Sequence, residues 1–303
     1  MIVITTPTGQ IGRQVLADVL DGAGTEPVRV IARDPARLPE RIRRRVEAVE
    51  GSHGDATVLD RAFKDADAVF WLVPPDDEAA SIEQAYSGFA RPAVAAFERH
   101  GVRRVVGVSA LGRGTDVAAQ AGHVTATLAM DDLIAGSGVA YRALTMPSFM
   151  DNLLWQAAPI KNSGMFFGPI DADRELPSVA TRDIAAVAAR LLLDPTWNGV
   201  AEQPVLGPED LSHNDMARII SEVLETPVRY QQIPFQTFTA NLTGRGMSQA
   251  VAQAMTDMMS AKNAGLDNAA IRTPLTSTPT SFRQWCQDTL KPAVQAQPAV
   301  QAQ

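Results

Sequence analysis

Met1-Ile-Val-Ile-Thr-Thr-Pro-Thr-Gly-Gln-Ile-Gly-Arg-Gln-Val-Leu16 is the stretch of sequence that decides the fold. Its first residues are apolar or β-branched and predict a buried parallel strand. Gly9 and Gly12 predict a tight turn that leads into a helix packed closely against that strand. The backbone N–H groups of such a turn, together with the N-terminus of its helix, face an anion. The stretch therefore predicts a site for the phosphates of a dinucleotide.

The turn departs from the usual motif at Thr6, because its G-x-x-G-x-x-G form has glycine at that position. A side chain there stands where the backbone is expected to approach the pyrophosphate. The amphipathic run Val15-Leu16-Val19-Leu20 after the two glycines supports the motif. A βα turn without a ligand is the alternative interpretation.

Composition places the chain among globular proteins. Its 303 residues are 46% hydrophobic and 20% charged, which allows one large α/β domain or a nucleotide domain with a smaller appendage. The net charge of −7 disfavours binding to nucleic acid. The basic cluster at 41–45 is followed by Glu47 and Glu50 and indicates a solvated helix end. We therefore expect no direct contact with nucleic acid.

The sequence carries no visible membrane or targeting signal. No apolar run approaches the roughly 20 residues that span a bilayer, and no basic region precedes the first strand. The single cysteine, Cys286, cannot form an internal disulfide and suits a small apolar filler. We expect a cytoplasmic protein that does not bind membranes.

Strand-like and helix-like segments alternate from residue 1 to about 210. This alternation predicts an α/β fold with a doubly wound, mainly parallel sheet. The predicted strands are 2–6, 28–32, 46–50, 68–73, 104–109, 140–146 and 203–206. The predicted helices include 58–63, 89–99, 126–135, 184–193 and 216–224, and Asp183 and Ser212 are expected to start the last two. Beyond these, we expect an extended segment over 228–234 and one or two helices over 249–264.

The end of the second strand, Ala32-Arg33-Asp34, bears on the choice of cofactor. A carboxylate at this position bonds the ribose 2′-hydroxyl of NAD, whereas an arginine accommodates the 2′-phosphate of NADP. Arg33 comes first along the chain, so NADP(H) is favoured over NAD(H). Asp34 keeps NAD open, and Arg33 as a plain loop residue is the remaining alternative.

Several stretches together resemble the NmrA-like branch of the atypical short-chain dehydrogenases. They are Thr6–Gly12, Ala32–Pro35, Gly54-Asp55 with Leu59 and Ala62, Asp65–Phe70, Ser137–Asn152 and Pro279–Trp285. The resemblance implies a Rossmann domain with a small, mostly helical C-terminal substrate region. Members of that branch include NAD(P)H-dependent quinone, azo and natural-product reductases, and also regulators that bind the cofactor without turning it over.

The resemblance implies two parts of the chain, an NAD(P)-binding Rossmann core over 1–150 and a substrate-binding region over 151–290 interleaved with the last strands of the sheet. The composition of the remainder indicates a tail over 291–303. The tail repeats a six-residue unit, Pro-Ala-Val-Gln-Ala-Gln, and is expected to be disordered or to act as a strap for a partner.

The resemblance also implies cofactor contacts. It assigns the pyrophosphate and ribose to Thr8, Gly9, Gln10, Ile11 and Gly12, with Thr6 counted in the same cofactor turn. It assigns the 2′-phosphate to Arg33, the adenine amino group to Asp55, and the flanks of the adenosine ribose to Leu72, Val73 and Pro74. For Asp55, a turn residue or helix cap after the third strand is the alternative.

The catalytic candidates depart from the common pattern. Ser109 ends the fifth strand, where many short-chain dehydrogenases use a serine to bond the substrate carbonyl beside a Tyr-x-x-x-Lys pair. This chain has His123-Val-Thr-Ala-Thr127 at the corresponding stretch. We consider His123 as a proton donor, with a packing role as its alternative, and Thr127 as a partner of the nicotinamide ribose.

Residues after the sixth strand are pocket candidates, and each is also a reasonable core residue. Met146 and Pro147 are expected beside the nicotinamide, and Phe149, Asn152 and Trp155 beside the substrate. No clustered His, Cys or carboxylate spacing in the sequence indicates a metal site.

The function predicted from the sequence is an NAD(P)H-dependent oxidoreductase that reduces a quinone-like or aromatic small molecule by hydride transfer without a Tyr-Lys pair. The alternatives are a non-catalytic regulatory protein that senses NADP(H), or a non-redox biosynthetic enzyme on the same fold. A homodimer or a regulatory protein partner is compatible with either.

Overall fold

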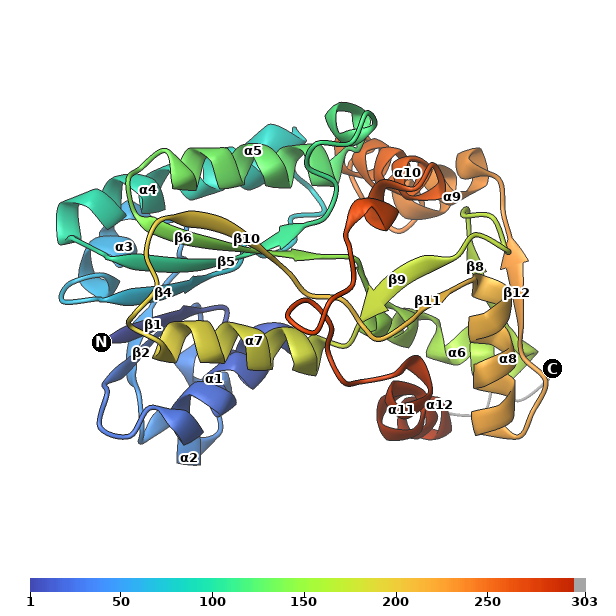
Figure 1. Cartoon of the computed structure of the whole chain (residues 1–303), viewed down its shortest axis with the longest axis horizontal. Helices are drawn as coiled ribbons and strands as arrows, with labels where there is room; N and C mark the ends of the chain where they lie inside the picture. Colours follow the sequence, from blue (N-terminus) through green and yellow to red (C-terminus); the bar gives the residue numbers. More distant parts are fainter. Residues whose placement is uncertain (297–303) are drawn as a thin grey trace. The chain divides into compact units, whose positions relative to one another are not determined.

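The computed structural model describes residues 1–296, which form two compact units (Figure 1). The first unit comprises Met1–Ala110, Ala126–Thr145 and Ile184–Gln203. The second unit comprises Leu111–Thr125, Met146–Asp183 and the chain from Pro204 onward. The chain passes repeatedly from one unit to the other, and the assignment of cofactor and substrate binding to 1–150 and 151–290 stays a prediction.

The first unit contains a seven-stranded sheet with the strand order β10-β6-β5-β4-β1-β2-β3. Its strands are β1 (Ile2–Thr5), β2 (Val28–Ala32), β3 (Glu47–Glu50), β4 (Ala68–Trp71), β5 (Arg104–Ala110), β6 (Ala140–Met146) and β10 (Val200–Pro204). The pairings of β1 with β2 and β4, of β2 with β3, and of β4 with β5 are parallel. The predicted doubly wound sheet is confirmed, although β10 begins three residues before the predicted strand at 203.

Helices lie on both faces of this sheet, with α4 and α5 on one face and α1 and α7 on the other (Figure 1). The helices are α1 (Gln10–Gly22), α2 (Glu40–Arg43), α3 (Ala56–Ala62), α4 (Phe89–His100), α5 (His123–Ala135) and α7 (Thr181–Leu193). β1, β2 and β4 are buried along their whole length, because helices cover them from both sides. Phe63 of the α3–β4 connection stacks on Phe97 of α4 with ring centroids 5.1 Å apart.

The second unit holds a three-stranded sheet, β11-β9-β7, and a parallel pair, β12-β8, surrounded by helices. Its strands are β7 (Ser148–Phe149), β8 (Met165–Gly168), β9 (Leu176–Val179), β11 (Asp210–Leu211) and β12 (Arg229–Gln232). Its helices are α6 (Ala157–Ser163), α8 (His213–Leu224), α9 (Phe235–Thr243), α10 (Gln249–Asn263), α11 (Phe282–Trp285) and α12 (Lys291–Ala296). The small and mostly helical C-terminal region is therefore present.

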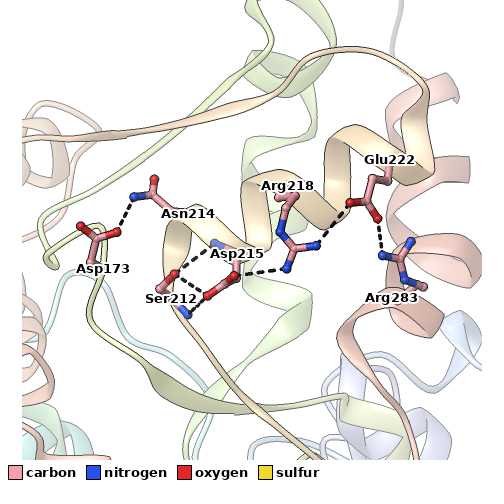
Figure 2. Close-up of polar contacts among 7 residues, drawn as sticks. All are labelled: Asp173, Ser212, Asn214, Asp215, Arg218, Glu222 and Arg283. Carbon is pink, nitrogen blue, oxygen red and sulfur yellow. Dashed lines mark hydrogen bonds and ion pairs between the residues drawn. The ribbon is translucent and has the colours of Figure 1, made fainter.

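Ser212 starts α8 as predicted, through a reciprocal capping box with Asp215. Its hydroxyl accepts a hydrogen bond from the Asp215 backbone N–H at 3.0 Å. Figure 2 shows that Asp215 also pairs with Arg218, which in turn contacts Glu222 at 3.3 Å. Glu222 forms an ion pair with Arg283, so this exposed polar row links α8 to α11.

The helix start predicted at Asp183 is wrong, because α7 begins at Thr181. The Asp183 carboxylate accepts hydrogen bonds from the backbone N–H of Thr280 at 3.1 Å and from its hydroxyl at 2.8 Å. A contact between residues 97 positions apart is not visible in local sequence. The contact with Thr280 explains why Asp183, a residue type that commonly caps helices, lies within the first turn of α7.

The tail begins later than predicted. Lys291–Ala296 form α12, with Val294 buried in the core of the second unit, so these residues are not disordered. The remainder of the predicted tail, 297–303, lies outside the described residues. Cys286 is fully buried, and burial raises the pKa of its thiol to about 12, which agrees with the predicted role as a filler.

Within residues 1–296, no helix combines the length and the apolar character needed to cross a membrane. The same residues contain no group of three or more His, Cys, Asp or Glu side chains placed to hold a metal ion.

Candidate functional site

The turn after β1 reverses at Thr6, which adopts a left-handed conformation with φ of 50°. The Thr6 carbonyl accepts a hydrogen bond from the N–H of Gly9 at 2.9 Å and lies directly over Gly12. A Cβ atom on Gly12 would stand 2.1 Å from the Thr6 carbonyl oxygen. Gly12 is therefore required by a close approach of backbones, while the left-handed residue is the threonine rather than one of the glycines.

The side chain of Thr6 lies against Gly12, because its Oγ1 would be 3.1 Å from a Cβ on that glycine. Oγ1 is buried and has no hydrogen-bond partner among the described residues. The hydroxyl thus occupies the space between the turn and α1. The Thr6 side chain does not fill the outer surface of the turn, where a phosphate would bind.

The N-terminus of α1 fits an anion. Gly9 is its N-cap, with extended backbone and no side-chain cap. The first-turn N–H groups of Gln10, Ile11 and Gly12 belong to a helix that carries no acidic residue in this turn. A helix N-terminus without a capping carboxylate favours a bound phosphate. The observed cradle therefore fits the pyrophosphate predicted from the sequence.

Arg33 and Asp34, which follow β2, make different contacts. Asp34 caps a short 3₁₀ turn and accepts a hydrogen bond from the backbone N–H of Ala36 at 3.0 Å. Arg33 is exposed, and its charge contributes to lowering the pKa of His53 after β3. The two loops that follow β2 and β3 therefore lie close enough for their side chains to interact.

Asp55 acts as the N-cap of α3, which was the structural alternative for this residue. Its Oδ1 accepts hydrogen bonds from the Thr57 backbone N–H at 2.7 Å and from the Thr57 hydroxyl at 2.8 Å. These bonds lower the pKa of the Asp55 carboxyl. The contact with adenine stays a prediction.

His53 is a residue that the sequence interpretation missed. It is buried, and its Nε2 lies 2.9 Å from the carbonyl oxygen of Leu72, while its ring packs edge-on against Trp71 and Phe89. Burial lowers the pKa of His53 to about 4, so the imidazole is neutral near neutral pH. The histidine anchors the end of β4 at Leu72, where the resemblance places the adenosine ribose.

Leu72 is held from a second side by Thr5 in β1. The Thr5 hydroxyl donates to the carbonyl of Phe70 at 3.0 Å and accepts from the N–H of Leu72 at 3.1 Å. Val73 and Pro74 follow directly, half-buried at the carboxyl end of β4. The predicted ribose contacts thus lie on a stretch of backbone held at Leu72 by Thr5 of β1 and by His53 of the loop after β3.

Ser109 lies at the carboxyl end of β5 and donates its hydroxyl proton to the carboxylate of Asp131 in α5. Tyr141 of β6 donates to the other oxygen of Asp131 at 2.6 Å. Asp131 is only 2% exposed. The sequence interpretation missed this carboxylate, whose only local signal is its place one helical turn after Thr127.

Thr127 shares a hydrogen bond with the phenol of Tyr86, whose pKa is raised by burial. Tyr86 lies in a π-helical turn, Gln84–Gly88, that leads directly into α4. Pro92 in α4 has no N–H to bond the carbonyl four residues earlier, at Gly88, which favours the wider turn at that point. Thr127 and Tyr86 therefore connect α5 to the π-helical turn that precedes α4.

The structure gathers the first-unit candidates at one edge of the sheet, because the carboxyl ends of parallel strands share an edge. The remaining candidates belong to the second unit: His123, Met146, Pro147, Phe149, Asn152 and Trp155. Met146 and Pro147 are buried, Phe149 is half-buried in β7, and Trp155 is 85% exposed. Asn152 is exposed as well. Their contacts with substrate or cofactor stay predictions.

The comparisons with known proteins agree with this arrangement. Residues 7–195 match the model of the NAD(P)H-binding family. An NAD(P)H azoreductase of Xenophilus azovorans is 30% identical over 258 residues, which cover 85% of this chain and 86% of the relative. The (4-alkanoyl-5-oxo-2,5-dihydrofuran-3-yl)methyl phosphate reductase of Streptomyces griseus is 30% identical over 292 residues, 94% of this chain and 96% of the relative.

Among solved structures, the NADPH complex of an NADPH-dependent quinone oxidoreductase from Escherichia coli shares the fold with a TM-score of 0.74. It is 21% identical to this chain, and the match covers 97% of this chain and 99% of that one. These matches show a shared Rossmann fold, and the chain therefore belongs to the NAD(P)H-binding family.

Proposed function

We propose that this chain is an NADPH-dependent oxidoreductase that transfers a hydride to a quinone-like or aromatic small molecule. The observation that carries the proposal is the turn after β1, where a glycine-capped helix N-terminus and the Thr6–Gly12 contact form a phosphate cradle. The relatives that match the chain over most of its length are reductases, which supports a redox role. The quinone oxidoreductase of the same fold supports a conjugated acceptor.

The backbone of Thr8 to Gly12 would hold the pyrophosphate, and Arg33 would hold the 2′-phosphate that distinguishes NADPH from NADH. The Asp34 Oδ1 accepts a hydrogen bond from the Ala36 backbone N–H, which supports this preference because one of the two carboxylate oxygens already bonds the protein backbone. The exposed guanidinium of Arg33 remains suited to a doubly charged phosphate.

The bound nicotinamide supplies the hydride, and the protein has three tasks around it. The cradle after β1 and the fixed backbone at Leu72 orient the cofactor. Alignment of the acceptor and exclusion of water are the remaining two tasks. A quinone oxygen that gains negative charge can take its proton from solvent, so the reaction does not need the Tyr-Lys pair used for ketones.

The test is NADPH consumption, followed by nicotinamide absorbance, with a panel of quinones and azo dyes. Steady turnover with at least one acceptor is expected. Tight NADPH binding without turnover on a broad panel would reject the reductase and leave an NADP(H)-sensing regulator. Product formation without any change in nicotinamide absorbance would instead indicate a non-redox enzyme.

Two further predictions accompany this function. A homodimer or a regulatory protein partner is tested by light scattering and by affinity capture, each with and without NADPH. A cytoplasmic location is tested by fractionation of the producing cells.

A further inference from the structure

The direction of the hydrogen bond at Ser109 limits what this residue can do. A serine hydroxyl has one proton and two acceptor lone pairs. The Ser109 proton is donated to Asp131, a residue 22 positions away on α5. Ser109 can therefore present only lone pairs to a ligand at the carboxyl edge of the sheet.

Asp131 keeps this direction because it is a buried carboxylate that needs donors. A polar group that is 2% exposed is stable only when hydrogen bonds replace its water. Tyr141 supplies the second donor, and its phenol passes directly over β5 at Gly107. A Cβ on Gly107 would lie 2.2 Å from the Tyr141 oxygen, so a glycine is needed for this crossing.

The ligand that suits Ser109 is consequently a donor. Quinone and carbonyl oxygens accept hydrogen bonds and cannot bond a hydroxyl that offers only lone pairs. The nicotinamide ribonucleoside of NADPH carries donors, in its carboxamide N–H₂ and its ribose hydroxyls. This geometry therefore favours the cofactor, and not the acceptor, as the hydrogen-bond partner of Ser109.

We propose that Asp131 is a positioning residue that holds Ser109 as a hydrogen-bond acceptor for the nicotinamide ribonucleoside, so that Ser109 does not polarise the substrate carbonyl. This inference rests on the proposed function, since it requires that the chain bind NADPH. It also reverses the role that the common serine pattern predicts for Ser109.

The first experiment measures Ser109→Ala. We expect the Kd for NADPH, titrated by fluorescence, to rise about 3- to 10-fold, which corresponds to the loss of one neutral hydrogen bond. With NADPH saturating and menadione as acceptor, any fall in kcat is expected to be no larger than the fold-rise in the NADPH Kd, because the lost contact is made to the cofactor and not to the acceptor.

The second experiment measures Asp131→Asn, which keeps the shape of the side chain but can donate. An amide N–H directed at Ser109 releases the serine proton, so we expect a rise in the NADPH Kd of similar size. The double variant Ser109→Ala/Asp131→Asn should be no weaker than either single variant, because both changes remove the same contact.

Tyr141→Phe is the matched control. It removes the donor to the other oxygen of Asp131 and leaves the Ser109 bond in place. Urea unfolding of every variant separates lost stability from lost binding, and we expect Tyr141→Phe to be less stable than the wild type with an NADPH Kd within about twofold of it.

Two results would overturn the inference. An unchanged NADPH Kd in Ser109→Ala together with a large loss of kcat would show that Ser109 donates to the substrate. Variants that lose stability but all bind NADPH like the wild type would show a purely structural network. A wild-type chain that does not bind NADPH would instead reject the proposed function, and this inference with it.

Discussion

Replacement of Thr6 by glycine is expected to stabilise the protein, although it changes the turn proposed to bind the cofactor. Thr6 adopts a φ of 50°, which costs an L-residue with a Cβ roughly 1–2 kcal/mol. Its buried hydroxyl lacks a partner among the described residues, which costs about 1–3 kcal/mol more. Glycine removes both penalties, but its greater flexibility in the unfolded chain lowers the free energy of unfolding by roughly 0.5–1 kcal/mol.

After allowance for lost packing of the side chain, the free energy of unfolding should rise by about 1–3 kcal/mol in Thr6→Gly. Urea unfolding without cofactor, followed by circular dichroism, measures this change. Thr6→Ala separates the two causes, because it removes the hydroxyl but keeps the Cβ in the left-handed conformation. Its gain should be smaller than that of Thr6→Gly.

A Thr6→Gly variant that is less stable than the wild type would refute this reasoning. Equal gains in Thr6→Gly and Thr6→Ala would show that the hydroxyl alone carries the cost. NADPH titration of the same variants tests the placement of the side chain, since a side chain turned toward Gly12 predicts that neither substitution weakens NADPH binding.

Three further predictions concern the same edge of the sheet. Gly12→Ala places a Cβ 2.1 Å from the Thr6 carbonyl oxygen and should lower both the free energy of unfolding and the NADPH affinity. Gly9→Ala places its Cβ 3.3 Å from the same oxygen and should lower both by less. Urea unfolding and NADPH titration check this ordering, and the reverse ordering would contradict the turn geometry. Arg33→Asp should weaken NADPH binding by about 10-fold or more while NADH binding changes little, and equal losses would remove the role in 2′-phosphate binding. His53 has a pKa of about 4 in the folded protein against 6.5 ordinarily, so the unfolded state takes up a proton first as the pH falls. The free energy of unfolding should therefore drop by up to about 3 kcal/mol between pH 6.5 and 4, and urea titrations of His53→Gln should show a flatter pH dependence than the wild type.

The parts of the fold that were predicted correctly depend on neighbouring residues. The apolar runs of β1 and β2 predict buried strands, and Ser212 predicts a helix start, because each signal is complete within a few positions. Asp183 misled the prediction, since its carboxylate serves a residue 97 positions away. The repeated tail sequence likewise hid the burial of Val294.

In the candidate site, too, local features were predicted from the sequence and long-range contacts were not. The spacing of Gly9 and Gly12 predicted a tight turn into a helix, yet the left-handed residue of that turn is Thr6. His53 carries no motif around it, and only its packing against Trp71 and Phe89 reveals that it anchors the strand end. A residue's environment is set by distant segments, so its pKa and its partners cannot be read from spacing.

For this protein, the sequence by itself determined the parallel sheet, the glycine turn after the first strand and the NAD(P)H-binding family, because strand burial and turn chemistry are local properties. Tertiary structure alone decided the division into two units, the left-handed Thr6 and the direction of the Ser109 hydrogen bond. The physical reason is that a hydroxyl donates to whichever acceptor lies beside it. At Ser109 that acceptor is Asp131, which the folding of α5 onto β5 places there.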